Sequence, residues 1–185
     1  MIIIQKAIFS KQDFKNSDSV LTQEFLDSIS SILDIEEIQE LKNYYQHFYY
    51  TRFQHSVNVA YYSFLICRKL NLDYISASQA GILHDFYLYD WKADKSSTDG
   101  RHSYVHPRIA LQNAKRFVKV NSIMEDAIVH HMWPMTLRCP KTLEGWVLQG
   151  VDKYCALSEF ALQATRKIKV SRMAIYASLI VSFIN

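Results

Sequence analysis

The 185-residue chain is 49% hydrophobic, which is enough for one compact domain with a sizeable core. Only four glycines and three prolines interrupt it, too few turn residues for a sandwich or a barrel, so the composition predicts an all-α fold. The formal net charge of +3, with basic and acidic residues mostly interspersed, predicts no broad surface for nucleic acid.

Helical periodicity runs through the first half of the chain. Apolar residues spaced three and four apart predict amphipathic helices over 18–33 and 35–50. A third helix is expected over 53–70, and a short, strongly apolar one over 76–86. Residues 88–105 are polar and have no sustained periodicity, which predicts a loop. A loop of that length inside a compact domain is usually functional or disordered.

The second half is again helical, with predicted helices over about 107–120, 122–132, 143–165 and 171–185. Pro107 fits the first turn of its helix, which makes His106 the expected cap residue. The basic run RKIKVSR over 166–172 is expected to be a solvated helix end. No internal repeat divides the chain, so we expect a single domain over 1–185.

The cysteines and the two ends of the chain bear on its location. Three cysteines form no C-x-x-C pair and are odd in number, as expected of thiols in a reducing cytoplasm. The start, MIIIQKAIF, lacks the basic region and the cleavage site of a secretion signal. The apolar stretch MAIYASLIVSFI is shorter than the ~20 residues that span a membrane. We therefore expect a cytoplasmic protein without membrane contact, ending in a packed helix.

Successive predicted helices each offer an imidazole or a carboxylate. His84 and Asp85 are adjacent at the end of an apolar helix, where a buried carboxylate is costly unless it is paired or binds a cation. Similar side chains lie on other predicted helices: His55, His106, His130, His131 and Asp152. Helical bundles build metal sites in this way, from inward side chains on facing helices.

The order of these residues resembles a known motif. It reads H…HD…D, with His55, His84, Asp85 and Asp152. This order is similar to that of the HD-domain superfamily of metal-dependent phosphohydrolases, which are all-helical bundles. The resemblance extends over about residues 50–160, through RFQHS, GILHDF, YVHPRIALQNA, HHMWP and VDKYCA. The additional histidines between the HD pair and the last aspartate resemble the subset of the superfamily that binds two metals.

The resemblance implies how the ligands divide between two metals. One metal would be held by His55, His84, Asp85 and Asp152. Asp85 would bridge to a second metal, held by His106 and by His130, His131 or both, and the context HMWP favours His131. No GYP follows the histidine doublet, a departure from the cyclic-dinucleotide phosphodiesterase branch, and the sequence context of the large (p)ppGpp enzymes is missing as well.

The implied chemistry is phosphoryl hydrolysis. Imidazole and carboxylate without thiolate suit divalent Mn, Fe, Co, Ni or Zn. Two such cations lower the pKa of a bridging water and clamp a phosphoryl group. The resemblance therefore implies cleavage of a phosphoester or phosphoanhydride by a metal-bridged hydroxide, in a small phosphorylated metabolite such as a nucleotide or dinucleotide. Besides Asp85, the cations Lys153 and Arg108 are catalytic candidates that could neutralise substrate phosphate. Arg52 is a candidate partner for a carboxylate near the site.

Two other functions are open at this point. A few relatives of the two-metal subset use a di-iron centre to activate oxygen, and the ligand set alone is compatible with that chemistry. A non-catalytic module that binds metal or senses a ligand is the other alternative. Against it, an abandoned metal site has no physical need to keep all of these groups.

Overall fold

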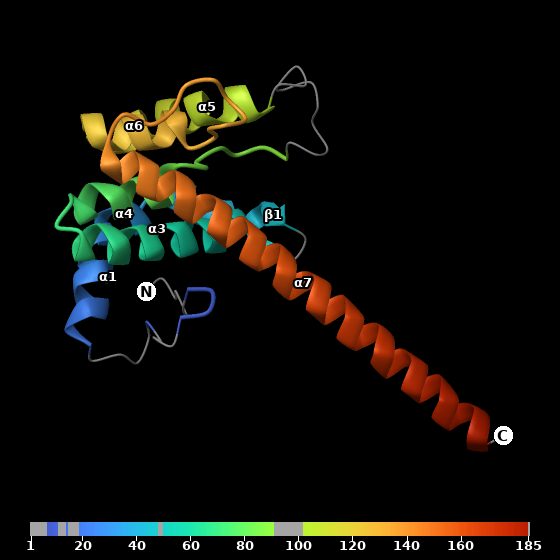
Figure 1. Ribbon diagram of the computed structural model, residues 1–185. Coiled ribbons are helices and arrows are strands. Elements are labelled where there is room, and N and C mark those ends of the chain that lie inside the picture. The colour runs from blue at the N-terminus through green and yellow to red at the C-terminus, as the bar shows by residue number, and fades with distance from the viewer. Residues whose placement is uncertain (1–6, 11–13, 15–18, 48–49, 91–101, 185) are drawn as a thin grey trace.

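The computed structural model describes residues 7–10, 14, 19–47, 50–90 and 102–184, with side chains up to 165 except that of residue 47. The described part of the chain is a bundle of helices with one small hairpin (Figure 1), which confirms the predicted all-α fold. The helices are α1 Val20–Leu33, α2 Glu36–Glu40, α3 Arg52–Lys69, α4 Tyr74–Leu83, α5 His102–Phe117, α6 Ser122–His130 and α7 Leu143–Ile184. A 3-10 turn, η1 Leu41–Asn43, precedes the antiparallel strands β1 Tyr45–His47 and β2 Tyr50–Thr51.

Local capping explains where several helices begin. The Thr51 hydroxyl accepts a hydrogen bond from the backbone N–H of Gln54 at the start of α3. The side chains of Asp73 and Asn121 do the same at the starts of α4 and α6. Each of these caps satisfies a backbone donor that has no partner within its helix, so these residues fix where the helices begin.

Helix α3 runs through the middle of the bundle, packed along α4 and crossed by α7 (Figure 1). Its contact with α4 is unusually close at Gly81, where a Cβ atom would lie 2.4 Å from the Cα of Ala60. Only a residue without a side chain allows the two backbones to approach this closely. The close approach brings the end of α4, with His84 and Asp85, beside the first turns of α3.

The helix predicted over 35–50 is wrong in its second half. It ends at Glu40, and the chain then forms η1 and the β1–β2 hairpin. The sequence YYQHFYY is rich in aromatic residues, which favour strands over helices. The backbone N–H of Arg52 also donates to the Tyr44 carbonyl at 2.7 Å, which holds the hairpin against the start of α3.

The start of α5 differs from the prediction as well. Residues 88–90 are irregular as expected, and 91–101 lie outside the described residues, but 102–105 are already helical. His106 is therefore within the helix and is not its cap. Its ring stacks on the His102 ring with centroids 4.4 Å apart, and its Nδ1 donates to the His102 carbonyl. These contacts hold the turn before Pro107 in helical form.

The two helices predicted over 143–165 and 171–185 are one continuous helix, α7. The intervening sequence RKIKV contains no glycine or proline that would break a helix. The C-terminal half of α7 extends away from the other described helices (Figure 1), so the terminal helix is not packed against the bundle as predicted. Among the described residues, no helix is both long and apolar enough to cross a membrane.

Candidate metal centre

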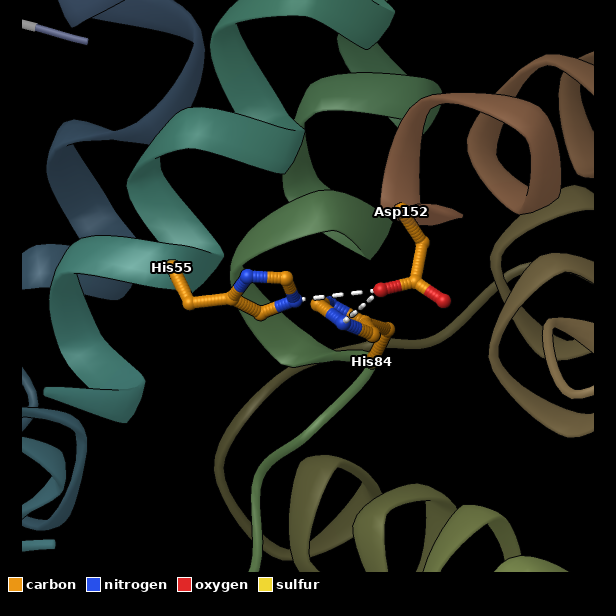
Figure 2. A group of neighbouring side chains, drawn as sticks. All are labelled: His55, His84 and Asp152. Carbon is orange, nitrogen blue, oxygen red and sulfur yellow. Dashed lines mark hydrogen bonds and ion pairs between the residues drawn. The ribbon is translucent and has the colours of Figure 1, made fainter. Parts of the chain in front are cut away.

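The first group of predicted ligands joins α3, the end of α4 and α7. His55 and His84 point toward the same oxygen of Asp152 (Figure 2). The distance to Asp152 Oδ1 is 3.0 Å from His55 Nε2 and 3.7 Å from His84 Nε2. Both imidazoles are buried, and the carboxylate is 14% exposed. The three residues can direct one ligand atom each at a common point.

The second group surrounds Asp85, next to the first. Its Oδ1 lies 3.3 Å from His106 Nε2 and 3.7 Å from His131 Nε2. Its Oδ2 lies 3.6 Å from His84 Nε2. Asp85 therefore faces both groups, one oxygen toward each. All of these side chains are buried, because they come from the inner ends of α4, α5 and α6.

The outer nitrogens of the histidines fix how the rings are oriented. Nδ1 donates to a backbone carbonyl in three of them: His84 to Gly81 at 2.9 Å, His106 to His102 at 2.7 Å and His131 to Ile128 at 2.7 Å. A carbonyl only accepts hydrogen bonds, so Nδ1 carries the proton and the Nε2 lone pair is directed inward. Metal-binding histidines are commonly held in this way.

The donor set fits divalent transition metals. His106 Nε2 and His131 Nε2 are 3.0 Å apart, and both present lone pairs because their Nδ1 atoms are donors. Two lone pairs at this distance repel unless a cation lies between them. Two imidazoles bound to one metal at ~2.1 Å with a right angle between the bonds have nitrogens about 3.0 Å apart. Within the described part of the chain, the buried His84 Nε2 and Asp85 Oδ1 also have no hydrogen-bond partner.

The charges of the centre are set by burial and by close ion pairs. Burial alone would raise the pKa of Asp85 and of Asp152, but the facing imidazoles outweigh it and hold both pKa values well below the usual range. Burial, reinforced by His106 and His84, lowers the pKa of His131 to about 3. The carboxylates are therefore charged and His131 is neutral at physiological pH, the forms in which these groups bind metals.

Glu159, which the sequence reasoning missed, supports His55 from α7. Its carboxylate oxygens lie 3.1 and 3.2 Å from His55 Nδ1, and Asn58 donates to it at 2.8 Å. Burial lowers the pKa of His55, but Glu159 and Asp152 outweigh it and raise that pKa well above its ordinary value. Glu159 follows Asp152 by two helical turns, so both lie on one face of α7. This spacing from Asp152 is the sequence feature that could have identified Glu159.

Gln46 is a second residue that the sequence reasoning missed. Its Nε2 donates to Asp85 Oδ2 at 2.6 Å, and its Oε1 accepts from Arg52 Nε at 3.2 Å. The expected pairing of Arg52 with a carboxylate is thus replaced by an amide between the two charges. The sequence pattern could not predict this role. It favours a helix over 35–50, and the contact with Asp85 joins residues that are 39 apart in the chain.

His130 is the one predicted ligand that lies away from the centre. Its Nδ1 is 2.8 Å from Asp126 Oδ1, within α6. The other oxygen of Asp126 accepts hydrogen bonds from the backbone N–H groups of Lys141 and Thr142, just before α7. His131 enters the centre because adjacent helical residues point about 100° apart. His130 belongs instead to a structural junction between α6 and α7.

The two candidate cations have different surroundings. Lys153 donates to the His131 carbonyl at 2.8 Å, lies 3.7 Å from Asp152 Oδ2 and lines the cavity above the centre. Arg108 is exposed on α5 and is absent from the described residues that line this cavity. Of the two, only Lys153 is placed to reach a ligand beside Asp152.

A cavity of about 480 Å³ opens onto the centre, within the range of small-molecule sites. Besides the predicted ligands, its lining includes polar residues and two methionines: Gln46, His102, Ser103, Lys153, Met132 and Met135. A larger cavity of about 740 Å³ lies between α1 and α4, but no histidine is among its lining residues in the described part of the chain. The chemistry, and not the volume, identifies the site.

Comparison with known proteins agrees with this geometry. The model of the HD domain family matches residues 52–157, more than half of the chain and the segment that carries every residue of both ligand groups. A relative named ribonuclease Y, from Clostridium kluyveri, is 27% identical over 139 residues, which cover 63% of this chain and 26% of that protein. The chain thus corresponds to about a quarter of that relative's length. No solved structure gives a significant match. With its helical bundle and paired His/Asp groups, the chain belongs to the HD domain family, whose members are in general metal-dependent phosphohydrolases.

Proposed function

We propose that this chain is a two-metal phosphohydrolase that cleaves a phosphoester or phosphoanhydride bond in a small phosphorylated metabolite, such as a nucleotide or dinucleotide. The observation that carries the proposal is the pair of inward lone pairs of His106 and His131, 3.0 Å apart beside Asp85 Oδ1, which has no hydrogen-bond partner among the described residues. A group of this kind next to a second imidazole–carboxylate group is what two neighbouring cations require.

The ligands would divide between the metals as the two groups do. His55, His84 and Asp152 would hold one metal, and His106 and His131 the other. Asp85 would contribute one oxygen to each. Two cations in these positions would lower the pKa of a bound water and neutralise charge on a phosphoryl group.

The residues around the centre would bind and orient the substrate. Lys153 has its ammonium group fixed by the His131 carbonyl, and its remaining N–H groups can bind phosphoryl oxygens. Burial and the neighbouring His106 lower the pKa of His102 to about 4, so this cavity residue is neutral at physiological pH and is not a general acid there. The methionines on the cavity wall offer adaptable apolar contacts for the organic part of a substrate.

The size and charge of the cavity support a small substrate over RNA. The name of the ribonuclease Y relative points to RNA, but this chain corresponds to only about a quarter of that protein's length. Among the described residues that line the cavity, Lys153 is the one lysine or arginine. Proteins that track a nucleic-acid backbone use a row of cations and stacking aromatic side chains.

The test is metal content and substrate turnover. The purified chain is analysed for bound metals and then screened for phosphate release from nucleotides, dinucleoside polyphosphates and sugar phosphates, with a short RNA as a comparison, with and without Mn²⁺. We expect about two metals per chain and Mn²⁺-dependent release from a small substrate. Asp152→Asn should lower the rate of phosphate release by more than ~10- to 100-fold, the loss that is typical when a group that only supports a ligand is removed.

The other results would each redirect the assignment. Absence of both bound metal and turnover contradicts the proposal. Cleavage of the RNA alone assigns a nuclease. Substrate-dependent oxygen uptake assigns the iron oxygenase alternative, whereas undiminished activity under argon excludes it. A wild-type protein that binds metals but turns over no substrate points to a ligand-sensing module.

A further inference from the structure

The Gln46 amide connects a buried cation to the central carboxylate. It lies on β1, outside the helices that carry the predicted ligands. Its Nε2 donates to Asp85 Oδ2 at 2.6 Å. Its Oε1 lies 3.2 Å from Arg52 Nε and 3.4 Å from the Tyr87 hydroxyl. The amide thus bridges two groups of opposite charge.

The orientation of this amide follows from its partners. A guanidinium group only donates hydrogen bonds, so the atom that faces Arg52 must be the amide oxygen. The amide N–H groups must then face Asp85, where a carboxylate accepts them. The amide dipole is favourable at both ends, with its oxygen toward the cation and its N–H toward the anion. Rotating the amide by 180° would place like partners together at both ends.

Arg52 is itself held rigidly. It is fully buried, and its terminal nitrogens donate to the carbonyls of Tyr87 at 2.5 Å and Tyr89 at 3.3 Å. Its guanidinium carbon lies 3.5 Å from the centre of the Tyr87 ring. These described partners are neutral groups. A buried positive charge with neutral partners makes the amide beside it a stronger donor toward Asp85.

The consequence for Asp85 is that its two oxygens differ. Oδ2 is anchored by Gln46, whereas Oδ1 has no hydrogen-bond partner in the described part of the chain. Oδ1 is also the oxygen that faces His106 and His131. If the carboxylate rotated, this oxygen would leave its position between the two imidazoles. The group of His55, His84 and Asp152 assembles without Asp85.

We propose that Gln46, oriented by Arg52, is a positioning residue that holds Asp85 for the metal beside His106 and His131, and that its loss weakens binding of that metal more than binding of the metal beside His55, His84 and Asp152, which can be held by those three residues. The inference rests on the metal-binding half of the proposed function and not on hydrolysis.

The experiment is a Mn²⁺ titration of the metal-free full chain, followed by the electron paramagnetic resonance signal of unbound Mn²⁺. The variant is Gln46→Met, which keeps the length of the side chain and removes the hydrogen bonds of the amide, among them those to Asp85 and Arg52. In the wild type we expect two equivalents of bound Mn²⁺. In Gln46→Met the second equivalent should weaken ~10- to 100-fold, as is usual when a group that orients a ligand is removed. The first should weaken less, because His55, His84 and Asp152 supply that metal with three ligands besides Asp85.

The matched control is Gln79→Met. Gln79 is also a half-buried glutamine whose amide donates to a partner on another element, the Ser28 carbonyl at 3.0 Å, but it lies at the α1–α4 contact and is not among the described residues that line the cavity over the centre. The Gln79→Met protein should be less stable than the wild type, with both Mn²⁺ affinities unchanged. Gln46→Asn provides a second variant with a polar side chain that is too short to reach both partners, in case Gln46→Met does not fold.

The inference is overturned if a folded Gln46→Met or Gln46→Asn protein binds the second equivalent within about threefold of the wild type. It is also overturned if both equivalents weaken equally, since that result indicates a general structural role. A wild type that binds two Mn²⁺ ions but hydrolyses nothing contradicts the proposed hydrolase and leaves this inference standing.

Discussion

At the scale of single residues, the two halves of the histidine doublet have different surroundings. His131 is 1% exposed and points into the centre, where its ring packs at a steep angle against those of His84 and His106. His130 faces Asp126 on its own helix. The difference comes from the rotation between consecutive positions at the end of α6, so two chemically identical side chains can be tested against each other.

The first prediction concerns this doublet. His131→Ala should abolish binding of the Mn²⁺ ion beside His106, because it removes one of the two facing lone pairs. His130→Ala should leave both Mn²⁺ affinities unchanged and lower the free energy of unfolding by about 1–2 kcal/mol, since it removes a hydrogen bond to a charged group. Mn²⁺ titration and urea denaturation of both variants provide the measurement. Equal effects on Mn²⁺ binding would contradict the assignment of His131 alone.

The second prediction concerns Asp126 and its dependence on pH. Burial raises the pKa of Asp126, but hydrogen bonds from Thr142, Lys141 and His130 outweigh it and lower that pKa below its ordinary value. The unfolded chain therefore binds the proton more tightly. The stabilisation is fully present above the unfolded pKa of ~4 and is lost as the pH falls through the lower folded value.

Asp126→Asn should therefore lower the free energy of unfolding by about 1–3 kcal/mol at pH 7, and this difference from the wild type should shrink below about pH 4. Urea denaturation at pH 7, 5, 4 and 3 measures it. A difference that stays constant over this range would show that the charge of Asp126 contributes nothing.

At the scale of the elements, the centre depends on how closely α3 and α4 approach. Gly81 packs against Ala60, and His84 with Asp85 follows one turn later. The spacing of the two backbones therefore decides whether His84 reaches the oxygen of Asp152 that His55 also faces. The position of His84 therefore depends on the absence of a side chain at Gly81.

The third prediction follows from this contact. Gly81→Ala would place a Cβ atom 2.4 Å from the Ala60 Cα, so the helices must separate. We expect the free energy of unfolding to fall by about 1–3 kcal/mol, as at other overpacked sites, and Mn²⁺ binding to weaken. Gly150→Ala on α7 is the control, because nothing lies within 4 Å of its new Cβ and alanine is favoured in a helix. It should be neutral or stabilising. Wild-type behaviour of Gly81→Ala would contradict the importance of the contact.

The elements that could be predicted from the sequence are those that the spacing of apolar residues indicates. Helices α1, α3, α4 and α6 follow from apolar spacing, and side-chain caps begin the last three. The hairpin and the early start of α5 depend instead on contacts that apolar spacing does not reveal, such as the Arg52–Tyr44 hydrogen bond and the stacked rings of His102 and His106. The site shows the same division. Its ligands lie in recognisable motifs, whereas Gln46 and Glu159 meet their partners 39 and 104 residues away.

At the scale of the whole molecule, the centre joins elements that also pack together through the apolar core. Its residues come from α3, the end of α4, α5, the end of α6 and α7. In the absence of cations, the inward nitrogens and oxygens of these elements repel one another in places, as at His106 and His131. Cations bound there would tie the elements together and replace that repulsion by bonds, so the stability of the whole bundle should depend on metal.

The fourth prediction is a rise in the melting temperature with Mn²⁺. A ligand at 100 times its Kd stabilises the folded state by ~2.7 kcal/mol, provided that it binds the unfolded chain negligibly. For a chain of this size, 1 kcal/mol corresponds to ~2–4 °C, so each bound ion should raise the melting temperature by roughly 5–10 °C. Thermal unfolding with EDTA and with Mn²⁺ measures the shift. Asp152→Asn, which impairs the site near His55 and His84, should lose about half of it. An equal shift in this variant would mean that Mn²⁺ binds elsewhere, because the cation beside His55 and His84 requires the carboxylate that both imidazoles face.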